Sequence, residues 1–282
     1  MHEHMKKYFS LIAILWLLSI NSLMAFEGYT NVGARSASMG RTSVAMTDFW
    51  AIHNNPAGIS LQQNVAVGMA YENRFLMKEL SLKSGGFIMP VNFGVLGVSF
   101  NQFGYSAFNE NKIGLAYARA FSPKLRLGVQ LDYLATRFGE GYEGNNLFTF
   151  EIGAQSDLTE KLTVAAVVFN PVGVKQSTLT NEKIPVVMRL GLGFRFTESL
   201  FATAEFEKRS GSGADGRIGF EYNIIKHFYA RAGVAVNPGL FSFGAGWQTN
   251  MLQIDLAASV HQILGTTAQA SLVFHFGSRN KP

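Results

Sequence analysis

The sequence predicts an all-β fold, a closed antiparallel transmembrane β-barrel of about 14 strands with a small N-terminal plug. Three observations predict it. From residue 64 onward, apolar residues alternate with polar or small ones over segments of about ten residues, the length of a tilted membrane strand. Only 15% of the residues are charged although 48% are hydrophobic, whereas a soluble domain carries roughly a quarter charged residues. The connecting segments are short at one end of the strands and longer at the other.

Residues 1–25 are predicted to be a secretory signal peptide. Lys6 and Lys7 form its basic start, the apolar run 9–20 forms its core, and Ala25 offers a cleavage site. The apolar run is too short to span a membrane as a helix, which takes about 20 residues. We therefore expect an exported chain whose destination is the outer membrane of a Gram-negative bacterium.

Residues 26–62 are predicted to form the plug. Small side chains crowd the stretch 33–45, and the Asn-Asn-Pro-Ala-Gly run at 54–58 turns the chain before the first strand. Small side chains let two backbones approach closely, which suits a segment packed inside a barrel or across its mouth. The alternative is a surface loop that leads into the first strand.

The barrel is predicted to occupy residues 63–277, and the polar tail 278–282 follows it. The clearest strand covers 125–133, where every second residue is large and apolar. Counting such segments gives about fourteen strands, with twelve as an alternative. They centre on 64–72, 78–89, 94–104, 110–121, 124–136, 147–156, 161–170, 185–195, 199–209, 215–223, 227–236, 239–248, 251–262 and 266–276.

The lengths of the connections separate a membrane barrel from a soluble sandwich. If the chain enters from the periplasm, the connections on that side are short, as at 90–92, 122–124 and 197–198. The opposite side carries the longer segments 139–146 and 171–184. A soluble β-sandwich would also alternate, but nothing in it would sort the connections by length in this way.

The polar faces of the strands carry most of the mid-strand charges, and we expect these charges to face the lumen. By alternation they are Lys83, Arg126, Asp132, Glu151, Arg189, Arg195, Glu205, Glu207, Arg217, Glu221, Arg231 and Asp255. An isolated buried charge is costly, so they should pair with one another or with the plug. They could form a stabilising ladder or line a polar conduit, and their close balance favours the ladder. Frequent glycines on the same face indicate that a backbone approaches the wall from inside.

No catalytic or metal-binding motif is present, so neither an enzyme nor a cofactor is expected. The chain has no cysteine, which excludes disulfides and thiolate metal sites. His261, Asp255 and Ser259 share one face and could be imagined as a hydrolase site, an alternative that three common residue types do little to support. His53, beside the turn cluster, is expected to hydrogen-bond the plug. The net charge of +5 is small and scattered, which argues against a nucleic-acid partner.

Residues 33–60 resemble the N-terminal signature of the FadL/PorV superfamily of outer-membrane barrels. The matching residues are Gly33, Ala34, Arg35, Ser36, Ala37, Met39, Gly40, Asp48, Asn55, Pro56, Ala57 and Gly58. The resemblance implies a fourteen-stranded barrel with an N-terminal plug. Some members pass long-chain fatty acids or aromatic hydrocarbons, and others serve type IX protein secretion.

This chain departs from the fatty-acid transporters because it is short and lacks their long extracellular insertions. The sequence therefore favours the PorV/PorQ-like proteins of Bacteroidota, non-enzymatic barrels accessory to secretion or surface assembly. The alternative is a FadL-like channel for small hydrophobic molecules, and a third possibility is a purely structural barrel. The expected partners are outer-membrane lipid and either secretion-system components or a hydrophobic small molecule.

Overall fold

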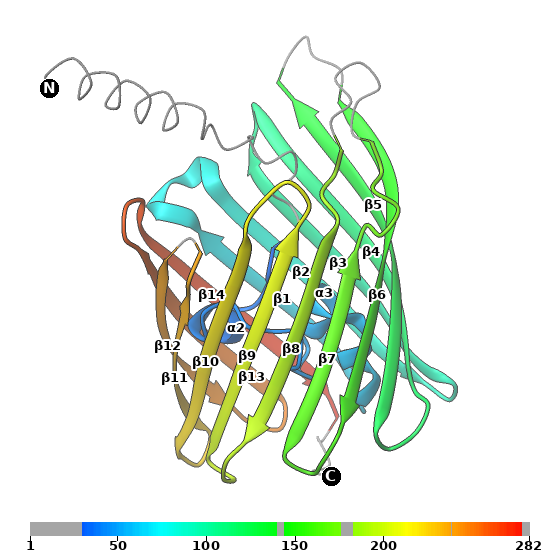
Figure 1. The fold of residues 1–282 in the computed structure, drawn as a ribbon, viewed down its shortest axis with the longest axis vertical. Helices are drawn as coiled ribbons and strands as arrows, with labels where there is room; N and C mark the ends of the chain where they lie inside the picture. Colours follow the sequence, from blue (N-terminus) through cyan, green and yellow to red (C-terminus); the bar gives the residue numbers. More distant parts are fainter. Residues whose placement is uncertain (1–29, 140–143, 176–182, 238, 278–282) are drawn as a thin grey trace, which may run out of the picture.

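The computed structural model describes residues 30–139, 144–175, 183–237 and 239–277. Fourteen strands form one closed antiparallel barrel in which sequence neighbours pair and β14 closes the ring on β1 (Figure 1). The strands are β1 (Val65–Asn73), β2 (Ser81–Val91), β3 (Gly94–Tyr105), β4 (Phe108–Ala120), β5 (Leu125–Phe138), β6 (Asn145–Asp157), β7 (Leu162–Phe169), β8 (Val187–Arg195), β9 (Leu200–Arg209), β10 (Ala214–Ile225), β11 (Phe228–Ala235), β12 (Leu240–Gln248), β13 (Leu252–His261) and β14 (Gly265–Phe276). The predicted barrel and its fourteen strands are confirmed, and the alternative of twelve strands is wrong.

The two ends of the barrel differ in their connections. At the end where β1 begins and β14 finishes, two to four residues join consecutive strands, and we call this the turn end. The opposite, loop end carries the three longest connections, 74–80, 139–144 and 170–186, and the first of these contains the two short 3-10 helices η2 (Arg74–Leu76) and η3 (Lys78–Leu80). The predicted sorting of short and long connections is therefore present in the fold.

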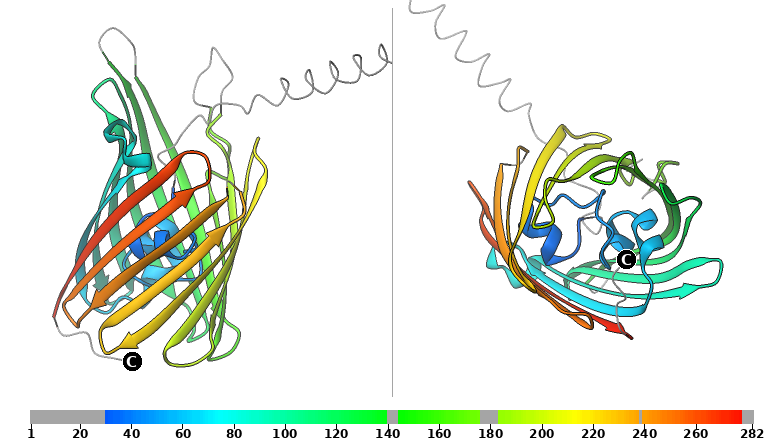
Figure 2. Two further views of the ribbon diagram at one scale, coloured as in Figure 1. Left: turned by 90° about the vertical axis from the view of Figure 1, so that its left-hand side faces the viewer. Right: turned by 90° about the horizontal axis from the view of Figure 1, so that it is seen from below.

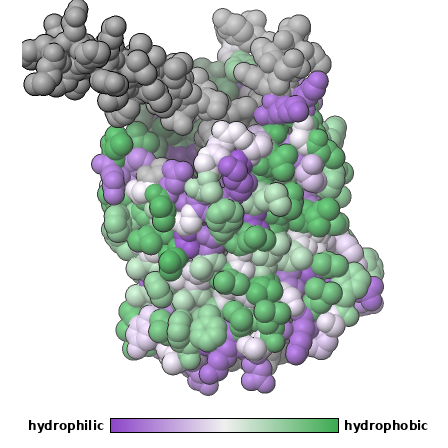
Figure 3. Space-filling model, viewed as in Figure 1, coloured by the Kyte–Doolittle hydropathy of each residue, from purple (hydrophilic) through white to green (hydrophobic). Residues whose placement is uncertain are grey.

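Side chains alternate between the interior and the outer wall along each strand. In β8, Met188, Leu190 and Leu192 are exposed, whereas Arg189 and Gly191 are buried. Apolar side chains cover much of the outer face seen in Figure 3. A closed sheet leaves no unpaired edge, so its backbone hydrogen bonds are satisfied without water and an apolar outer wall can face lipid.

Within the described residues, no helix has the length and apolar character needed to cross a membrane.

The segment 30–62 lies inside the ring of strands (Figure 2), and we call it the plug. It contains the helices α2 (Ala34–Ser38) and α3 (Ala51–Asn54) and the 3-10 helix η1 (Pro56–Leu61). Almost every plug side chain is buried, so the surface-loop alternative is wrong. The proposed signal peptide and the tail 278–282 fall outside the described residues, and those boundaries stay predictions.

Glycines in the wall make room for the plug. A Cβ added at Gly233 of β11 would lie 2.2 Å from the backbone nitrogen of Gly40, and one at Gly128 of β5 would lie 2.4 Å from the carbonyl carbon of Pro56. Both positions tolerate only hydrogen, because the plug backbone rests directly on the strand. The expectation drawn from the inward-facing glycines is confirmed at these two positions.

Replacing Gly233 by Ala should weaken the folded barrel. The new methyl group overlaps the plug backbone, and overpacking of this kind costs about 1–3 kcal/mol. The matched control is Gly216→Ala in β10, whose Cβ would meet only a methyl of Val236 at 4.0 Å. Urea unfolding of both variants in detergent is the measurement, and equal stability of the two would contradict the direct plug–wall contact.

Candidate functional site

The plug is attached to the barrel by two chemically different sides. One side meets charged residues of β8–β11 and β13, and we call this set of contacts the ionic anchor. The other side packs apolar residues against β1–β4 and β14, and we call it the apolar seam. The candidate site consists of the plug, these two attachments and the space below the plug.

Arg35 of α2 carries the first half of the ionic anchor. It donates two hydrogen bonds to Glu221 of β10, at 2.7 and 2.8 Å, and one to Asp48 of the plug at 3.1 Å. Glu221 also accepts from Arg231, which reaches Asp255, both at 2.6 Å. Burial alone would lower the pKa of Arg35, but the charges of Glu221 and Asp48 outweigh it and raise the pKa above its usual value. The plug is thereby fixed to three strands by charges that alternate in sign.

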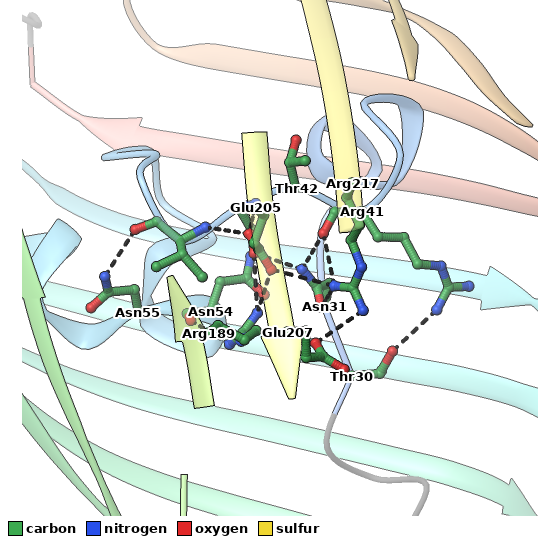
Figure 4. Close-up of polar contacts among 12 residues, drawn as sticks. Thr30, Asn31, Arg41, Thr42, Asn54, Asn55, Arg189, Glu205, Glu207 and Arg217 are labelled. Carbon is green, nitrogen blue, oxygen red and sulfur yellow. Dashed lines mark hydrogen bonds and ion pairs between the residues drawn. The ribbon is translucent and has the colours of Figure 1, made fainter. Parts of the chain in front are cut away.

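Glu205 of β9 centres the second half of the ionic anchor (Figure 4). Its carboxylate accepts the backbone N–H of Ser43 at 2.7 Å and pairs with Arg217 at 3.3 Å. Arg189 lies 3.8 Å from the same carboxylate and donates to the backbone carbonyl of Asn54 at 2.5 Å. Strand side chains thus supply hydrogen bonds to plug backbone groups that have no helix or sheet partner.

Other buried ion pairs lie within the wall itself. Lys112 of β4 pairs with Glu151 of β6 and lies 3.4 Å from Asp132 of β5. Nearer the turn end, Arg126 makes a bidentate pair with Asp157, at 2.6 and 2.7 Å. These pairs cross-link β4, β5 and β6 on the inner face, the arrangement expected of a ladder of charges.

Two of the expected lumen charges lie elsewhere. Lys83 is exposed on the outer side of β2, opposite the exposed Tyr71, so its placement in the lumen is wrong. The neighbouring Leu82 faces inward and is 1% exposed. The lumen is apolar at this point, so here the apolar residue faces the interior and the charged residue faces outward. Arg195 has the inward parity of β8 but lies at the turn-end mouth, exposed and stacked on Phe201 at 5.6 Å.

The remaining ten expected charges are buried, and the structure adds buried charges that the sequence analysis missed. These are Glu72, Arg74, Glu110, Lys112 and Asp215. Glu72 pairs with Arg41 of the plug at 3.0 Å and with Arg74 at 2.7 Å. Strict alternation through β1 and β4 would have found Glu72 and Lys112, whereas Arg74 lies beyond the end of its strand.

The plug motif residues are buried in the centre of the barrel, apart from Arg35, which is partly exposed. Gly33 and Gly40 have φ angles of 102° and 67°, a region that glycine adopts without strain. The side-chain oxygen of Asn55 accepts the N–H of Ala57 at 3.1 Å, and its amide donates to the carbonyl of Val44 at 2.8 Å. The Asn-Pro-Ala-Gly turn is therefore held by its own first residue.

The apolar seam is built from six plug residues, Val32, Phe49, Trp50, Ala51, Ile52 and Ile59. They pack against the inward residues Ala66, Ala70, Leu82, Ile88, Val95, Phe103, Ala116, Ala118 and Val273. Wall glycines form the sockets here, since a Cβ at Gly68 or Gly97 would overlap the ring of Phe49 or the side chain of Ile52. The cluster itself contains only hydrophobic residues, and on this side an ion pair between Arg41 and Glu72 of β1 also joins the plug to the wall.

His53 lies next to the seam, with its ring 5.8 Å from that of Trp50. Burial, helped by the charge of Lys112, lowers the pKa of His53 to about 3, so the imidazole is neutral. The backbone of Gly85 approaches it, but neither ring nitrogen makes a hydrogen bond with the described residues. The expectation that His53 hydrogen-bonds the plug is therefore wrong.

Below the plug, at the turn end, lies a polar chamber of about 1030 Å³. Arg35 and Asp48 line it from the plug, and Asp157, Lys161 and Glu198 line it from the wall and turns. Because both signs of charge are present, the chamber is suited to water and not to an apolar molecule.

The residues considered for hydrolysis do not assemble. Asp255 and His261 are six residues apart on one extended strand, a separation of about 20 Å. Asp255 is taken up by Arg231, and the Nδ1 of His261 accepts the backbone N–H groups of Ile263 and Leu264 in the next turn. Among the described residues, no group of three or more His, Asp or Glu side chains could hold a metal ion.

No protein-family model matches this sequence, and no curated protein matches it significantly. Solved structures do match. The CymD monoaromatic hydrocarbon channel aligns over 91% of this chain and 100% of its own, with a TM-score of 0.66 and 15% identity. The P. putida toluene transporter TodX aligns over 88% of this chain and 99% of its own, with a TM-score of 0.65 and 12% identity. A Pseudomonas aeruginosa FadL homologue aligns over 87% of this chain and 97% of its own, with a TM-score of 0.58 and 14% identity.

The fold is that of the FadL and TodX channels. At these identities the similarity concerns the fold alone, and it extends over most of the described chain. A FadL-like fold is a fold of Gram-negative outer-membrane barrels, in agreement with the apolar outer wall.

Removing one partner from the ionic anchor should destabilise the protein strongly. Glu205→Gln removes the charged acceptor shared by Arg217, Arg189 and the Ser43 N–H, and because Arg217 keeps Glu207 and Asp215 we expect a loss of about 1–3 kcal/mol. Glu198→Gln, at an exposed position near the turn end, is the matched control and should change stability by less than about 0.5 kcal/mol. Urea unfolding in lipid vesicles measures both, and a small effect at Glu205 would mean that the anchor contributes little.

Acidification should selectively destabilise the protein through His53. Its pKa is about 3 in the folded chain against 6.5 for the ordinary group, so the unfolded chain binds the proton first as the pH falls. Stability is then lost progressively between pH 6.5 and 3. His53→Phe cannot take up this proton, so its thermal midpoint should fall less than that of the wild type over this range. Parallel pH profiles for the two proteins would contradict the buried, neutral imidazole.

Proposed function

We propose that this protein is an outer-membrane channel that admits small hydrophobic molecules, with the turn end toward the periplasm and the plug as its gate. The apolar seam carries the proposal. A barrel built only for stability could fill its lumen with ion pairs throughout, as the β8–β13 side does. Here the β1–β4 side instead presents an apolar contact between the wall and the plug, a segment short enough to move as a unit.

The FadL-like fold supports the same function. Two of the matching proteins are described as a hydrocarbon channel and a toluene transporter. The absence of an enzymatic arrangement among the described residues fits a transport role, and we propose that the protein is not an enzyme. The ion-paired, plugged lumen supports a channel that is closed to ions at rest.

A second candidate is an accessory role in type IX secretion or surface assembly, of the PorV/PorQ type. The N-terminal motif at 33–58 and the modest loops favour it. In that function the plug would stay in place and the outer surface or loops would meet the partner. The two candidates therefore differ in whether the plug must move.

Deleting the gene in its host should reduce uptake of a radiolabelled aromatic hydrocarbon or long-chain fatty acid, and a plasmid copy should restore it. The reason is that an apolar solute crosses the hydrated outer-membrane surface poorly without a channel. The control is uptake of a small sugar, which should not change. If hydrophobic uptake is unchanged while the set of secreted or surface-attached proteins is altered, the secretion role replaces the channel.

A further inference from the structure

We infer that the hydrophobic ligand binds along the apolar seam, between the plug and β1–β4, while the ionic anchor stays closed and acts as the hinge. We further infer that the ligand has an apolar body with one uncharged hydrogen-bonding group. This inference rests on the proposed channel function and specifies where the ligand passes and what it carries.

The energetic difference between the two sides of the plug decides where it can open. Moving the plug away from β9 and β10 would break the Arg35–Glu221 pair and the hydrogen bond from the Ser43 N–H to the Glu205 carboxylate, and an apolar molecule cannot replace either contact. Separating the seam exposes mainly apolar surface, which an apolar ligand covers again as it enters. The Arg41–Glu72 pair on this side would also open, but Glu72 keeps Arg74 as a partner. A ligand shifts a conformational equilibrium only by its differential affinity for the two states. A hydrophobic ligand has that differential affinity at the seam and not at the anchor.

Two polar groups within the seam indicate the ligand's chemistry. The indole N–H of Trp50 has no hydrogen-bond partner among the described residues, and the same holds for both ring nitrogens of His53. Both side chains are at most 2% exposed. Trp50 directly precedes α3 and His53 lies within it, with their rings 5.8 Å apart. Buried donors and acceptors normally find a partner. An alcohol, phenol or ketone group placed between them would supply one.

An ionised group is disfavoured at the same place. His53 is neutral, so it offers no charge to a carboxylate. The nearby Lys112 is already engaged by Glu151 and Asp132. An anion entering the seam would therefore lose its hydration without gaining a free cation.

Engineered disulfides can lock either side of the plug, because the chain contains no cysteine of its own. On the seam side, a Cβ at Gly86 would lie 3.4 Å from the Cγ2 of Ile52, which allows the pair Ile52→Cys and Gly86→Cys. On the anchor side, a Cβ at Gly193 would lie 3.4 Å from the Cβ of Ala45, which allows Ala45→Cys and Gly193→Cys. The two locked proteins are matched controls for each other, and a reductant returns each to its unlocked state.

Trp50 itself reports binding. The chain has three tryptophans, Trp16, Trp50 and Trp247, so Trp16→Phe with Trp247→Phe leaves Trp50 as the only indole fluorophore. Bromine atoms quench indole fluorescence at contact, and the probes are 4-bromophenol, with one uncharged hydroxyl, and bromobenzene, without it. Purified protein carrying either lock is titrated with each probe before and after reduction.

We expect 4-bromophenol to quench Trp50 in the anchor-locked protein and in the reduced seam-locked protein, but not in the oxidised seam-locked protein. The preference for 4-bromophenol over bromobenzene should be about tenfold, the value of one hydrogen bond, and His53→Phe should abolish it.

Equal quenching in the oxidised and reduced seam-locked protein overturns the seam as the binding site, and loss of quenching in the oxidised anchor-locked protein overturns the anchor as the hinge. Equal affinity for both probes overturns the assignment of the polar group. A lock that prevents folding is recognised because reduction then fails to restore wild-type quenching. Ile52→Phe, which enlarges a seam side chain without adding an indole, then replaces the lock with the same expected loss of binding.

Uptake by cells carrying the same variants separates this inference from the proposed function. If wild-type cells take up no hydrophobic probe although the purified protein still shows quenching, the channel function is wrong and the binding site stands. If the oxidised seam-locked protein still supports uptake at the wild-type level, the seam is not the binding site and the channel function stands.

Discussion

The structure depends on the pairing of charges inside a closed barrel. Arg189, Arg217 and Arg231 project from the wall into an interior with little water, where an unpaired charge costs several kcal/mol. Carboxylates on neighbouring strands satisfy part of this requirement, and the plug adds the backbone carbonyls of Asn54 and Arg41, which accept from Arg189 and Arg217. The plug's own Arg35 in turn pairs with Glu221 of the wall. The wall and the plug are therefore electrostatically incomplete without each other.

Steric fit and electrostatics lead to the same arrangement. Gly128, Gly219 and Gly233 remove the side chains that would keep the plug backbone away from the strands. Close contact in turn brings plug N–H and C=O groups within hydrogen-bonding distance of wall side chains such as Glu205 and Gln155. A short segment with little regular structure is thereby held in one position, although helices of four to six residues would not be stable alone.

The chemical asymmetry of the lumen connects this architecture to function. On the β8–β13 side, directional ion pairs fix the plug, and on the β1–β4 side non-directional apolar contacts hold it. Non-directional contacts can be exchanged for an apolar ligand, whereas directional ones between charges cannot. The polar chamber at the turn end lies beneath the charged part of the plug. Transfer of a hydrophobic molecule from the apolar seam into this chamber would be unfavourable.

The sequence by itself predicted the barrel, a count of about fourteen strands, a plug at the small-residue segment and most of the inward charges, because period-two alternation and glycine placement are local signals. It left open a count of twelve strands and whether the plug lies inside the barrel or across its mouth. It failed at Lys83, where Leu82 points into the lumen: alternation gives the two faces of a strand but not which one meets lipid when the interior is itself apolar. Only the tertiary structure decided that the plug would have an ionic and an apolar side, since the partners of Arg35, Glu205 and Phe49 are far away along the chain. Those pairings follow from closure of the barrel around the plug, which no local pattern records.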